Sequence, residues 1–348
     1  MNGKHQVEAF IKSYLRVIKP YSTERDEFSG RAEVFLDANE SPYDSGVNRY
    51  PDPRQLDLKV AIAALKGIDE ANIFVGNGSD EAIDLLTRII ATEQGVTITP
   101  PTYGMYRVAA SVQGLPVLDA PLTADFRLDF DAVGRAGEAG SRLLFLCSPN
   151  NPVGNQLPLA DIEQALEMFN GIVVVDEAYI DFASGPSATA LLERNDRLVV
   201  LQTFSKAWGM AGIRLGVAFA TESIVEVLNK VKLPYNVNSL THRYALERLR
   251  DPAVVFRQVE EIKCERVRVS QALAELPRVN AVIPSEANFI LFRVDEPCGL
   301  FECLRGQGII IRDRSRELYC EGCLRMTIGT REENDRTLQV IAQWARGD

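Results

Sequence analysis

Histidine is scarce in this chain of 348 residues, which contains only His5 and His242. A catalytic zinc site with two or three histidine ligands is therefore nearly excluded, as is most chemistry in which histidine activates a serine or a cysteine. If the protein is an enzyme, its acid–base chemistry must come from Lys, Tyr, Asp or Glu side chains, or from a cofactor.

Long apolar runs and basic runs are also absent. Apolar stretches such as 172–175 fall far short of the roughly 20 residues that a transmembrane helix needs. Residues 2–14 mix charged with apolar side chains and contain no signal-peptide core. With 38 Lys and Arg against 48 Asp and Glu, the net charge is −10. The sequence thus argues against nucleic acid or membrane partners and predicts a cytoplasmic protein that binds anions through a few placed donors.

Six cysteines are present, and in a reducing cytoplasm they are expected to be thiols. The last four form a C-x4-C pair, Cys298 and Cys303, and a C-x2-C pair, Cys320 and Cys323, a spacing that a small metal knuckle also shows. The apolar stretch 324–328 is typical of a strand and not of a ligand turn, which favours scattered thiols. No metal site is predicted.

Continuous apolar runs that alternate with amphipathic segments predict an α/β fold. Runs of this kind are buried on both faces, as in a parallel sheet covered by helices. Strands are expected at 34–36, 73–75, 96–99, 143–147, 172–175, 198–201 and 215–218. Helices are expected at 7–18, from Asp52-Pro53 onward, at 79–91, from about Tyr103 and at 159–169.

The pattern changes near Pro234. One long helix is expected at 252–276, followed by strands at 288–294, 309–311 and 324–328 and a closing helix at 332–346. A length of 348 residues suggests about two domains. We therefore expect a large α/β domain at 35–235, and a smaller α+β domain formed by 236–348 together with the N-terminal segment 1–34.

Ligands of doubly wound sheets bind at the carboxyl ends of the strands, and the first three relevant strand ends carry distinctive motifs. A glycine-rich turn with Ser79 and Asp80 opens a helix, whose free N–H groups attract anions. A plain helix start explains the same residues. Tyr103 is placed either to stack on a flat ligand or to fill the core. Asn151 lies in a rigid turn with two prolines.

The last two strand ends carry a carboxylate and a lysine. Asp176 follows a fully apolar strand, where a charge is costly unless it is paired, and Tyr179 lies three residues further on. Lys206, one of nine lysines, stands among apolar and small residues that would lower its pKa and free its amine. Arg214 follows eight residues later. Each residue also has a simpler interpretation when it is considered alone. Asp176 could form a salt bridge or cap a helix, and Lys206 could be an ordinary exposed lysine in a loop.

Together the five strand ends match the needs of pyridoxal 5′-phosphate. Its aldehyde requires a lysine, its pyridinium a carboxylate, its phenolic oxygen polar partners, its ring a stacking group, and its phosphate an arginine and a helix N-terminus. The chain resembles the fold-type-I pyridoxal-phosphate aminotransferases, and among them the histidinol-phosphate aminotransferases. The resemblance extends from Tyr21 to the C-terminal helix.

The resemblance rests on the order and spacing of eight motifs. They are Asn39-Glu40-Ser41-Pro42-Tyr43, Arg49-Tyr50-Pro51-Asp52, Gly78-Ser79-Asp80-Glu81, Pro101-Thr102-Tyr103-Gly104-Met105-Tyr106, Ser148-Pro149-Asn150-Asn151-Pro152, Val175-Asp176-Glu177-Ala178-Tyr179, Ser205-Lys206-Ala207 and Cys323-Leu324-Arg325-Met326-Thr327-Ile328-Gly329-Thr330-Arg331. One departure is Val153, where relatives usually carry threonine.

The resemblance implies a role for each residue at the cofactor ring. Lys206 would hold the cofactor covalently and then move protons during the reaction. Asp176 would keep the pyridine nitrogen protonated, Tyr179 and Asn151 would hydrogen-bond the phenolic oxygen, and Tyr103 would stack on the ring.

It also implies how the cofactor phosphate is held. Ser205, Arg214 and the backbone and side chains of Ser79 and Asp80 would bind it. Tyr50 would reach the phosphate of the neighbouring subunit's cofactor, which implies a homodimer.

At the substrate end, Arg325 would bind the anionic group, helped by Arg312 and Tyr21. A solvated Arg312 that pairs with Asp313 is the alternative for that residue. The implied reaction exchanges nitrogen between L-histidinol phosphate and 2-oxoglutarate, giving imidazole acetol phosphate and L-glutamate, in histidine biosynthesis. The alternatives are a related aromatic amino-acid aminotransferase and a lyase similar to threonine-phosphate decarboxylases. A catalytically inactive binding module is disfavoured because Lys206 and the phosphate and ring partners are all retained.

Overall fold

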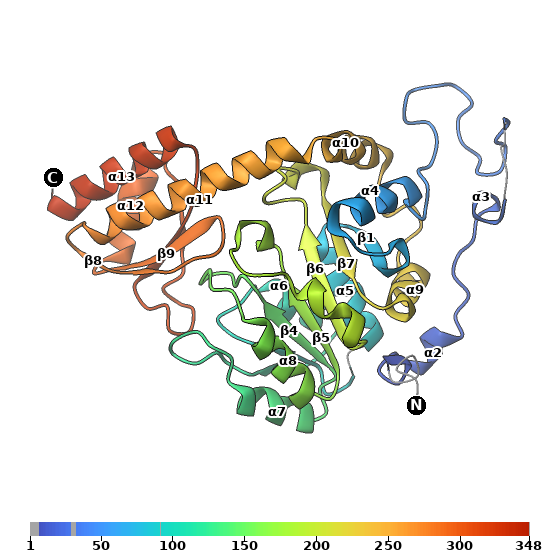
Figure 1. Cartoon of the computed structure of the whole chain (residues 1–348), viewed down its shortest axis with the longest axis horizontal. Coiled ribbons are helices and arrows are strands. Elements are labelled where there is room, and N and C mark those ends of the chain that lie inside the picture. The colour runs from blue at the N-terminus through green and yellow to red at the C-terminus, as the bar shows by residue number, and fades with distance from the viewer. Residues whose placement is uncertain (1–6, 29–32, 91, 348) are drawn as a thin grey trace.

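Two β-sheets organise the chain in the computed structural model, which describes residues 7–28, 33–90 and 92–347 (Figure 1). The larger has seven strands in the order β1-β7-β6-β5-β4-β2-β3, and the smaller has four in the order β10-β11-β9-β8. The strands of the larger sheet are β1 Ile73–Asn77, β2 Val96–Ile98, β3 Val117–Asp119, β4 Leu143–Cys147, β5 Ile172–Asp176, β6 Leu198–Thr203 and β7 Leu215–Phe219.

Helices cover both faces of the larger sheet, as its apolar strands predict. Successive residues of β5 alternate between two hydrophobic clusters: Val173 packs with α4, α7 and α8, whereas Val174 packs with α5, α6 and α9. These helices are α4 Leu56–Lys66, α5 Ser79–Ile90, α6 Met105–Val112, α7 Phe130–Glu138, α8 Leu159–Met168 and α9 Glu222–Val231. The predicted α/β class with a mostly parallel sheet between helices is confirmed.

The register of the larger sheet decides which side chains meet at its carboxyl edge. β2, β3, β4, β5 and β6 pair in parallel, whereas β7 is antiparallel to both β1 and β6. Cys147 at the end of β4 lies opposite Asp176 at the end of β5, which in turn lies opposite Leu201 of β6. Residues that follow these strands therefore converge at one edge.

The smaller sheet is antiparallel and packs under the C-terminal helices, at the left of Figure 1. Its strands are β8 Val279–Ile283, β9 Phe289–Val294, β10 Arg312–Asp313 and β11 Cys323–Thr327. The helices over this sheet are α11 Pro252–Ala274, α12 Pro297–Gly306 and α13 Arg331–Arg346, whereas α10 Ser239–Leu249 packs beside α4 and contributes Ala245 to the core of the larger sheet. None of the helices in the described part of the chain is long and apolar enough to cross a membrane.

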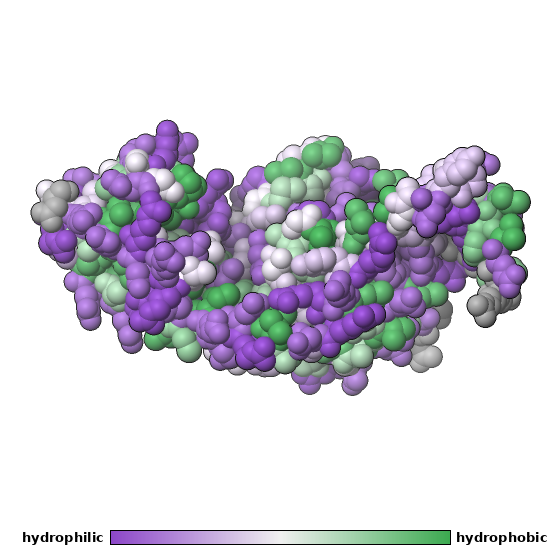
Figure 2. All heavy atoms as spheres, turned by 90° about the horizontal axis from the view of Figure 1, so that it is seen from above, coloured by the Kyte–Doolittle hydropathy of each residue, from purple (hydrophilic) through white to green (hydrophobic). Residues whose placement is uncertain are grey.

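The N-terminal residues form an arm with little regular structure. It contains the short helices α2 Ser13–Arg16 and α3 Glu24–Glu27. Glu40 is the centre of its polar contacts: its carboxylate pairs with Arg25 at 2.6 Å and Arg49 at 2.7 Å and accepts the backbone N–H of Tyr50 at 2.7 Å. These partners hold the pKa of Glu40 down at about 2. Hydrophobic surface is visible at the right of Figure 2. Several hydrophobic side chains of the arm are exposed, among them Leu36, which is 87% exposed.

Two predicted strands are wrong. Residues 34–36 form no strand, because no neighbouring strand supplies hydrogen-bond partners to the arm. Residues 309–311 are irregular, and pairing begins only at Arg312, opposite Arg325. Within the predicted helix over 7–18, residues 7 and 8 are helical, residues 9 and 10 form a turn, and the second helical stretch is α2.

A predicted helix start is also displaced. α4 begins at Leu56 because Gln55 adopts a left-handed conformation, although Asp52 still accepts the Leu56 N–H at 2.7 Å. Residue 91, the expected end of α5, lies outside the described residues. The elements β3, β8, α7, α9, α10 and α12 were not expected.

The predicted division into domains at 35–235 and at 1–34 with 236–348 stays a prediction. Residues 1–6, 29–32 and 348 of these ranges lie outside the described residues. Val7, Ile11 and Leu15 are buried against the α5–α9 face of the larger sheet. The described part of this N-terminal segment thus packs on the larger sheet.

Candidate active site

A cavity of about 370 Å³ lies at the carboxyl edge of the larger sheet, beside the smaller sheet. It is lined by Ser79, Asp80, Tyr103, Cys147, Asn151, Asp176, Ala178, Tyr179, Thr203, Ser205, Lys206, Ala211, Arg214, Arg312, Arg314 and Arg325. The structure therefore brings together every site residue predicted from the sequence except Tyr21 and Tyr50.

Asp176 is a buried carboxylate at the end of β5, only 2% exposed. The hydroxyl of Tyr106 donates to its Oδ2 at 2.7 Å, and the N–H of Ala178 donates to its Oδ1 at 3.1 Å. Burial raises the pKa of Asp176 to about 6, while these two hydrogen bonds oppose that rise. Tyr106 is itself fully buried and stacks on Phe145 with ring centroids 4.7 Å apart.

Lys206 lies in the turn that follows β6, with Nζ 5.6 Å from the centre of the Tyr179 ring. Burial, and next the charge of Arg325, lower the pKa of Lys206, whereas Asp176 acts in the opposite direction. A lowered pKa makes the neutral, nucleophilic amine more accessible at neutral pH. The Tyr179 ring is in turn fixed edge-on against Phe289, with centroids 5.1 Å apart.

The start of α5 forms an anion cradle. Gly78 has φ +78°, a backbone conformation that favours glycine, and a Cβ on it would approach Nη2 of Arg214 to 2.7 Å and displace that side chain. A Cβ on Gly216 would approach the backbone nitrogen of Ser79 to 2.1 Å. The free N–H groups and the positive end of the helix dipole face this space, where they favour a phosphate.

The side chain of Asp80 is occupied by two neighbours of the cradle, and its predicted role at a phosphate stays a prediction. Its carboxylate pairs with Arg214 at 3.3 Å and accepts the hydroxyl of Tyr103 at 3.2 Å. A carboxylate repels a phosphate, so Asp80 can support an anion only through its backbone N–H and by orienting Arg214 and Tyr103. Ser205 lines the same end of the cavity.

The opposite end of the cavity is formed by arginines of the smaller sheet. Arg325 on β11 donates to Oδ1 of Asn151 and lies over the ring of Phe289, 5.1 Å from its centre. Burial first, and then the charges of Arg314 and Arg312, lower the pKa of Arg325. Arg312 is exposed and lies opposite Arg325 in the β10–β11 pair. An anion is the ligand that such a cluster favours.

Tyr21 and Tyr50 lie on the N-terminal arm, outside this cavity. Tyr21 is 73% exposed and lines a separate cavity with Pro20 and Lys59. Tyr50 is 52% exposed and stacks on Tyr235 with ring centroids 4.4 Å apart. The predicted reach of Tyr50 into a second subunit stays a prediction, because one chain is described.

Sequence reasoning missed Tyr106, Cys147, Thr203 and Arg314. Arg314 lies two residues after Arg312 in an extended segment, where side chains two residues apart lie on the same face. This spacing could have predicted Arg314 as a site residue. Tyr106 gave no such signal, because its partner is 70 residues away in sequence. Burial raises the pKa of the Cys147 thiol to about 12, so this sulfur is not a nucleophile at neutral pH.

The residues around the cavity fit the cofactor that the resemblance implies. A desolvated amine, a buried carboxylate, an aromatic ring and an arginine beside a helix N-terminus all face one space. A model of the family described as aminotransferase class I and II matches residues 29–341. The chain belongs to this aminotransferase family.

Named relatives of this aminotransferase share nearly its whole length. It is 50% identical to the histidinol-phosphate aminotransferase of Parabacteroides distasonis over 93% of this chain and 94% of the relative. It is 47% identical to the histidinol-phosphate aminotransferase of Cytophaga hutchinsonii over 96% and 98%. The crystal structure of histidinol-phosphate aminotransferase from Sinorhizobium meliloti in complex with pyridoxal-5'-phosphate has the same fold, with a TM-score of 0.79, 23% identity and coverage of 89% and 90%.

Proposed function

We propose that this aminotransferase uses pyridoxal 5′-phosphate to exchange an amino group between L-histidinol phosphate and 2-oxoglutarate, giving imidazole acetol phosphate and L-glutamate in histidine biosynthesis. The observation that carries the proposal is one cavity that joins Lys206 and Asp176 to a cluster of arginines at its other end. Two relatives at 47% and 50% identity are named for this activity.

The larger sheet would hold the cofactor. The N–H groups at the start of α5, with Ser205 and Arg214, would bind its phosphate, while the Tyr103 ring would stack on its pyridine ring. The Tyr179 hydroxyl and the Asn151 side chain would hydrogen-bond its phenolic oxygen. Bound pyridoxal phosphate supplies an electron sink for negative charge that develops at the substrate carbon.

Asp176 and Lys206 would control the protons. The Asp176 carboxylate, held by Tyr106 and Ala178, would keep a proton on the pyridine nitrogen, because that ion pair would offset the cost of burying its charge. Lys206 would hold the cofactor, and its Nζ would act as the general base that accepts the proton from the substrate carbon. Its lowered pKa suits this step.

The arginines of the smaller sheet would orient the substrate. The guanidinium of Arg325 forms bidentate hydrogen bonds equally well with a carboxylate and with a phosphate. One arginine can therefore accept L-glutamate and L-histidinol phosphate in alternate half-reactions. Arg312, which lines the same end, would add positive charge for the phosphorylated substrate.

We also propose that the enzyme acts as a cytoplasmic homodimer, with Tyr21 and Tyr50 completing the site across the subunit interface. The exposed hydrophobic residues of the arm support this proposal, because contiguous apolar surface usually marks an interface. They include Val17, Val34, Leu36, Tyr43 and Val47.

Product analysis of the purified holoprotein tests the reaction. L-Histidinol phosphate and 2-oxoglutarate should yield L-glutamate, whereas O-phospho-L-threonine should release no CO2 and L-phenylalanine should be a poor amino donor. Release of CO2 would establish the lyase instead. Faster turnover of phenylalanine than of histidinol phosphate would establish the aromatic aminotransferase.

A further inference from the structure

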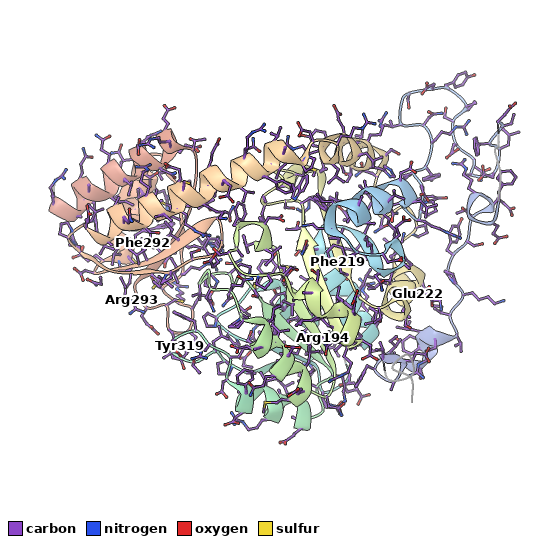
Figure 3. The ribbon with its side chains drawn as sticks, viewed as in Figure 1. Arg194, Phe219, Glu222, Phe292, Arg293 and Tyr319 are labelled. Carbon is purple, nitrogen blue, oxygen red and sulfur yellow. The ribbon has the colours of Figure 1, made fainter. Side chains whose placement is uncertain are left out.

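Arg314 is fixed beside the substrate end of the cavity by its own backbone. Its N–H donates to the carbonyl of Cys323 at 3.0 Å, which anchors it against the first residue of β11. The rest of its loop is attached to β9, because Arg293 donates to the carbonyl of Tyr319 at 3.0 Å (Figure 3). Arg314 is thus held close to Arg325, two residues along β11 from Cys323.

The Arg314 side chain is turned into the cavity. It lines the cavity and is only 19% exposed, although it belongs to a surface loop. Its charge acts on both neighbours across the cavity: it favours the ionised form of the Tyr179 hydroxyl, and it is the largest charge effect that lowers the pKa of Arg325. Both effects place the positive charge of Arg314 near Tyr179 and Arg325.

The arginines at this end of the cavity have fewer carboxylate partners than positive charges. Glu317 accepts from Arg314 at 3.3 Å and is itself 37% exposed. Among the ion pairs of the described residues, neither Arg312 nor Arg325 has a carboxylate partner. The Nε atoms of both Arg314 and Arg325 are buried without a hydrogen-bond acceptor in the described structure. Three guanidinium groups therefore share one partly exposed carboxylate.

We infer that Arg314 is a specificity-determining residue that binds the phosphate of the substrate together with Arg325. The inference rests on the proposed function and adds a residue to it. A phosphomonoester has three terminal oxygens and up to two negative charges, which need two guanidinium groups. The glutamate carboxylate that takes the same place has two oxygens and a single charge, which Arg325 alone satisfies. Arg314 would exchange its contact with Glu317 for the phosphate.

Single-turnover half-reactions of the holoenzyme, followed by cofactor absorbance, separate the two substrates. Arg314→Gln should lower kcat/KM for L-histidinol phosphate by about 10- to 150-fold and leave that for L-glutamate within about 3-fold. Arg316→Gln is the matched control, since Arg316 is an exposed arginine of the same loop outside the cavity lining. Losses of equal size on both substrates would overturn the inference.

Inorganic phosphate provides a binding measurement that does not depend on turnover of the phosphorylated substrate. It should inhibit the glutamate half-reaction competitively, and Arg314→Gln should weaken that inhibition while Arg316→Gln does not. Glu317→Gln removes the competing carboxylate and should bind phosphate at least as tightly as the wild type. Weakening by Glu317→Gln as large as that by Arg314→Gln would show that disruption of the loop is the cause.

Failure of the inference is distinct from failure of the proposed function. A wild-type enzyme that does not turn over L-histidinol phosphate refutes the function itself. Normal turnover by the wild type, with Arg314→Gln indistinguishable from Arg316→Gln, refutes only the role of Arg314.

Discussion

Replacing Tyr106 by phenylalanine tests whether its hydroxyl controls the charge of Asp176. The substitution keeps the ring that stacks on Phe145 and removes one oxygen, 2.7 Å from Oδ2 of Asp176. The Ala178 N–H, at 3.1 Å from Oδ1, would remain as the recorded donor to the carboxylate. Because the carboxylate is fully buried, water cannot replace the lost bond without rearrangement.

The expected shift in the pKa of Asp176 follows from the difference in free energy between a hydrogen bond to a charged group and one to a neutral group. A bond to an ionised group contributes about 1.5–3 kcal/mol and a neutral one about 1 kcal/mol. The difference, about 0.5–2 kcal/mol, should raise the pKa of Asp176 from about 6 to between roughly 6.4 and 7.5. A carboxyl group whose pKa is raised on folding contributes stability below its unfolded pKa, near 3.8, and loses that contribution as pH rises through the folded pKa.

Urea unfolding of the cofactor-free protein at pH 5 and pH 8 measures this effect. Tyr106→Phe should lower the free energy of unfolding by about 1 kcal/mol at pH 5, where Asp176 is mostly protonated, and by about 1.5–3 kcal/mol at pH 8. Tyr244→Phe, on the exposed face of α10, is the control and should change stability by less than about 0.5 kcal/mol at both pH values. An equal loss at both pH values for Tyr106→Phe would refute the coupling.

Four further predictions concern the proposed roles. Borohydride reduction and peptide mapping should place the pyridoxyl label on Lys206, and a label on another lysine would contradict its assignment. Asp176→Asn should still bind cofactor but lose most of its transamination rate, because a neutral ring is a poor electron sink; near-normal turnover would contradict this. Arg325→Ala should lower kcat/KM by about 10- to 150-fold in both half-reactions, measured separately, whereas a loss confined to one would show that it does not serve both substrates. Mixed subunits of Tyr50→Ala and Lys206→Ala should regain some activity if Tyr50 acts across the interface; demonstrated subunit exchange without rescue would argue against a shared site.

The larger sheet and much of the candidate site were predictable from the sequence. Strands β4, β5 and β6 are continuous apolar runs, and such runs fold stably only between two layers of helices. Parallel strands bring their carboxyl ends to one edge, so Asn151, Asp176 and Lys206 were expected to converge. Their joint pattern, more than any single residue, indicated the cofactor.

The remaining features depend on contacts that one-dimensional patterns do not encode. The apolar residues at 34–36 and 309–311 have strand-like composition, yet both segments lack partners that would make them strands. β8 was missed because its side chains are only partly buried and give a weak pattern. Tyr106 has the composition of a core residue, and its hydroxyl contact becomes apparent only when α6 packs over the end of β5.

The division of the cavity between the two sheets has a consequence for protein engineering. The cofactor cradle belongs to residues 78–214, whereas the guanidinium groups at the other end belong to the β10–β11 hairpin, residues 312–325. Under the proposed function, substrate preference and the capacity for amino transfer are thus encoded in separate stretches of sequence. We therefore expect that grafting this hairpin from other members of the family would change the substrate range, provided that each graft keeps the contact between Arg325 and Asn151 that joins the two halves.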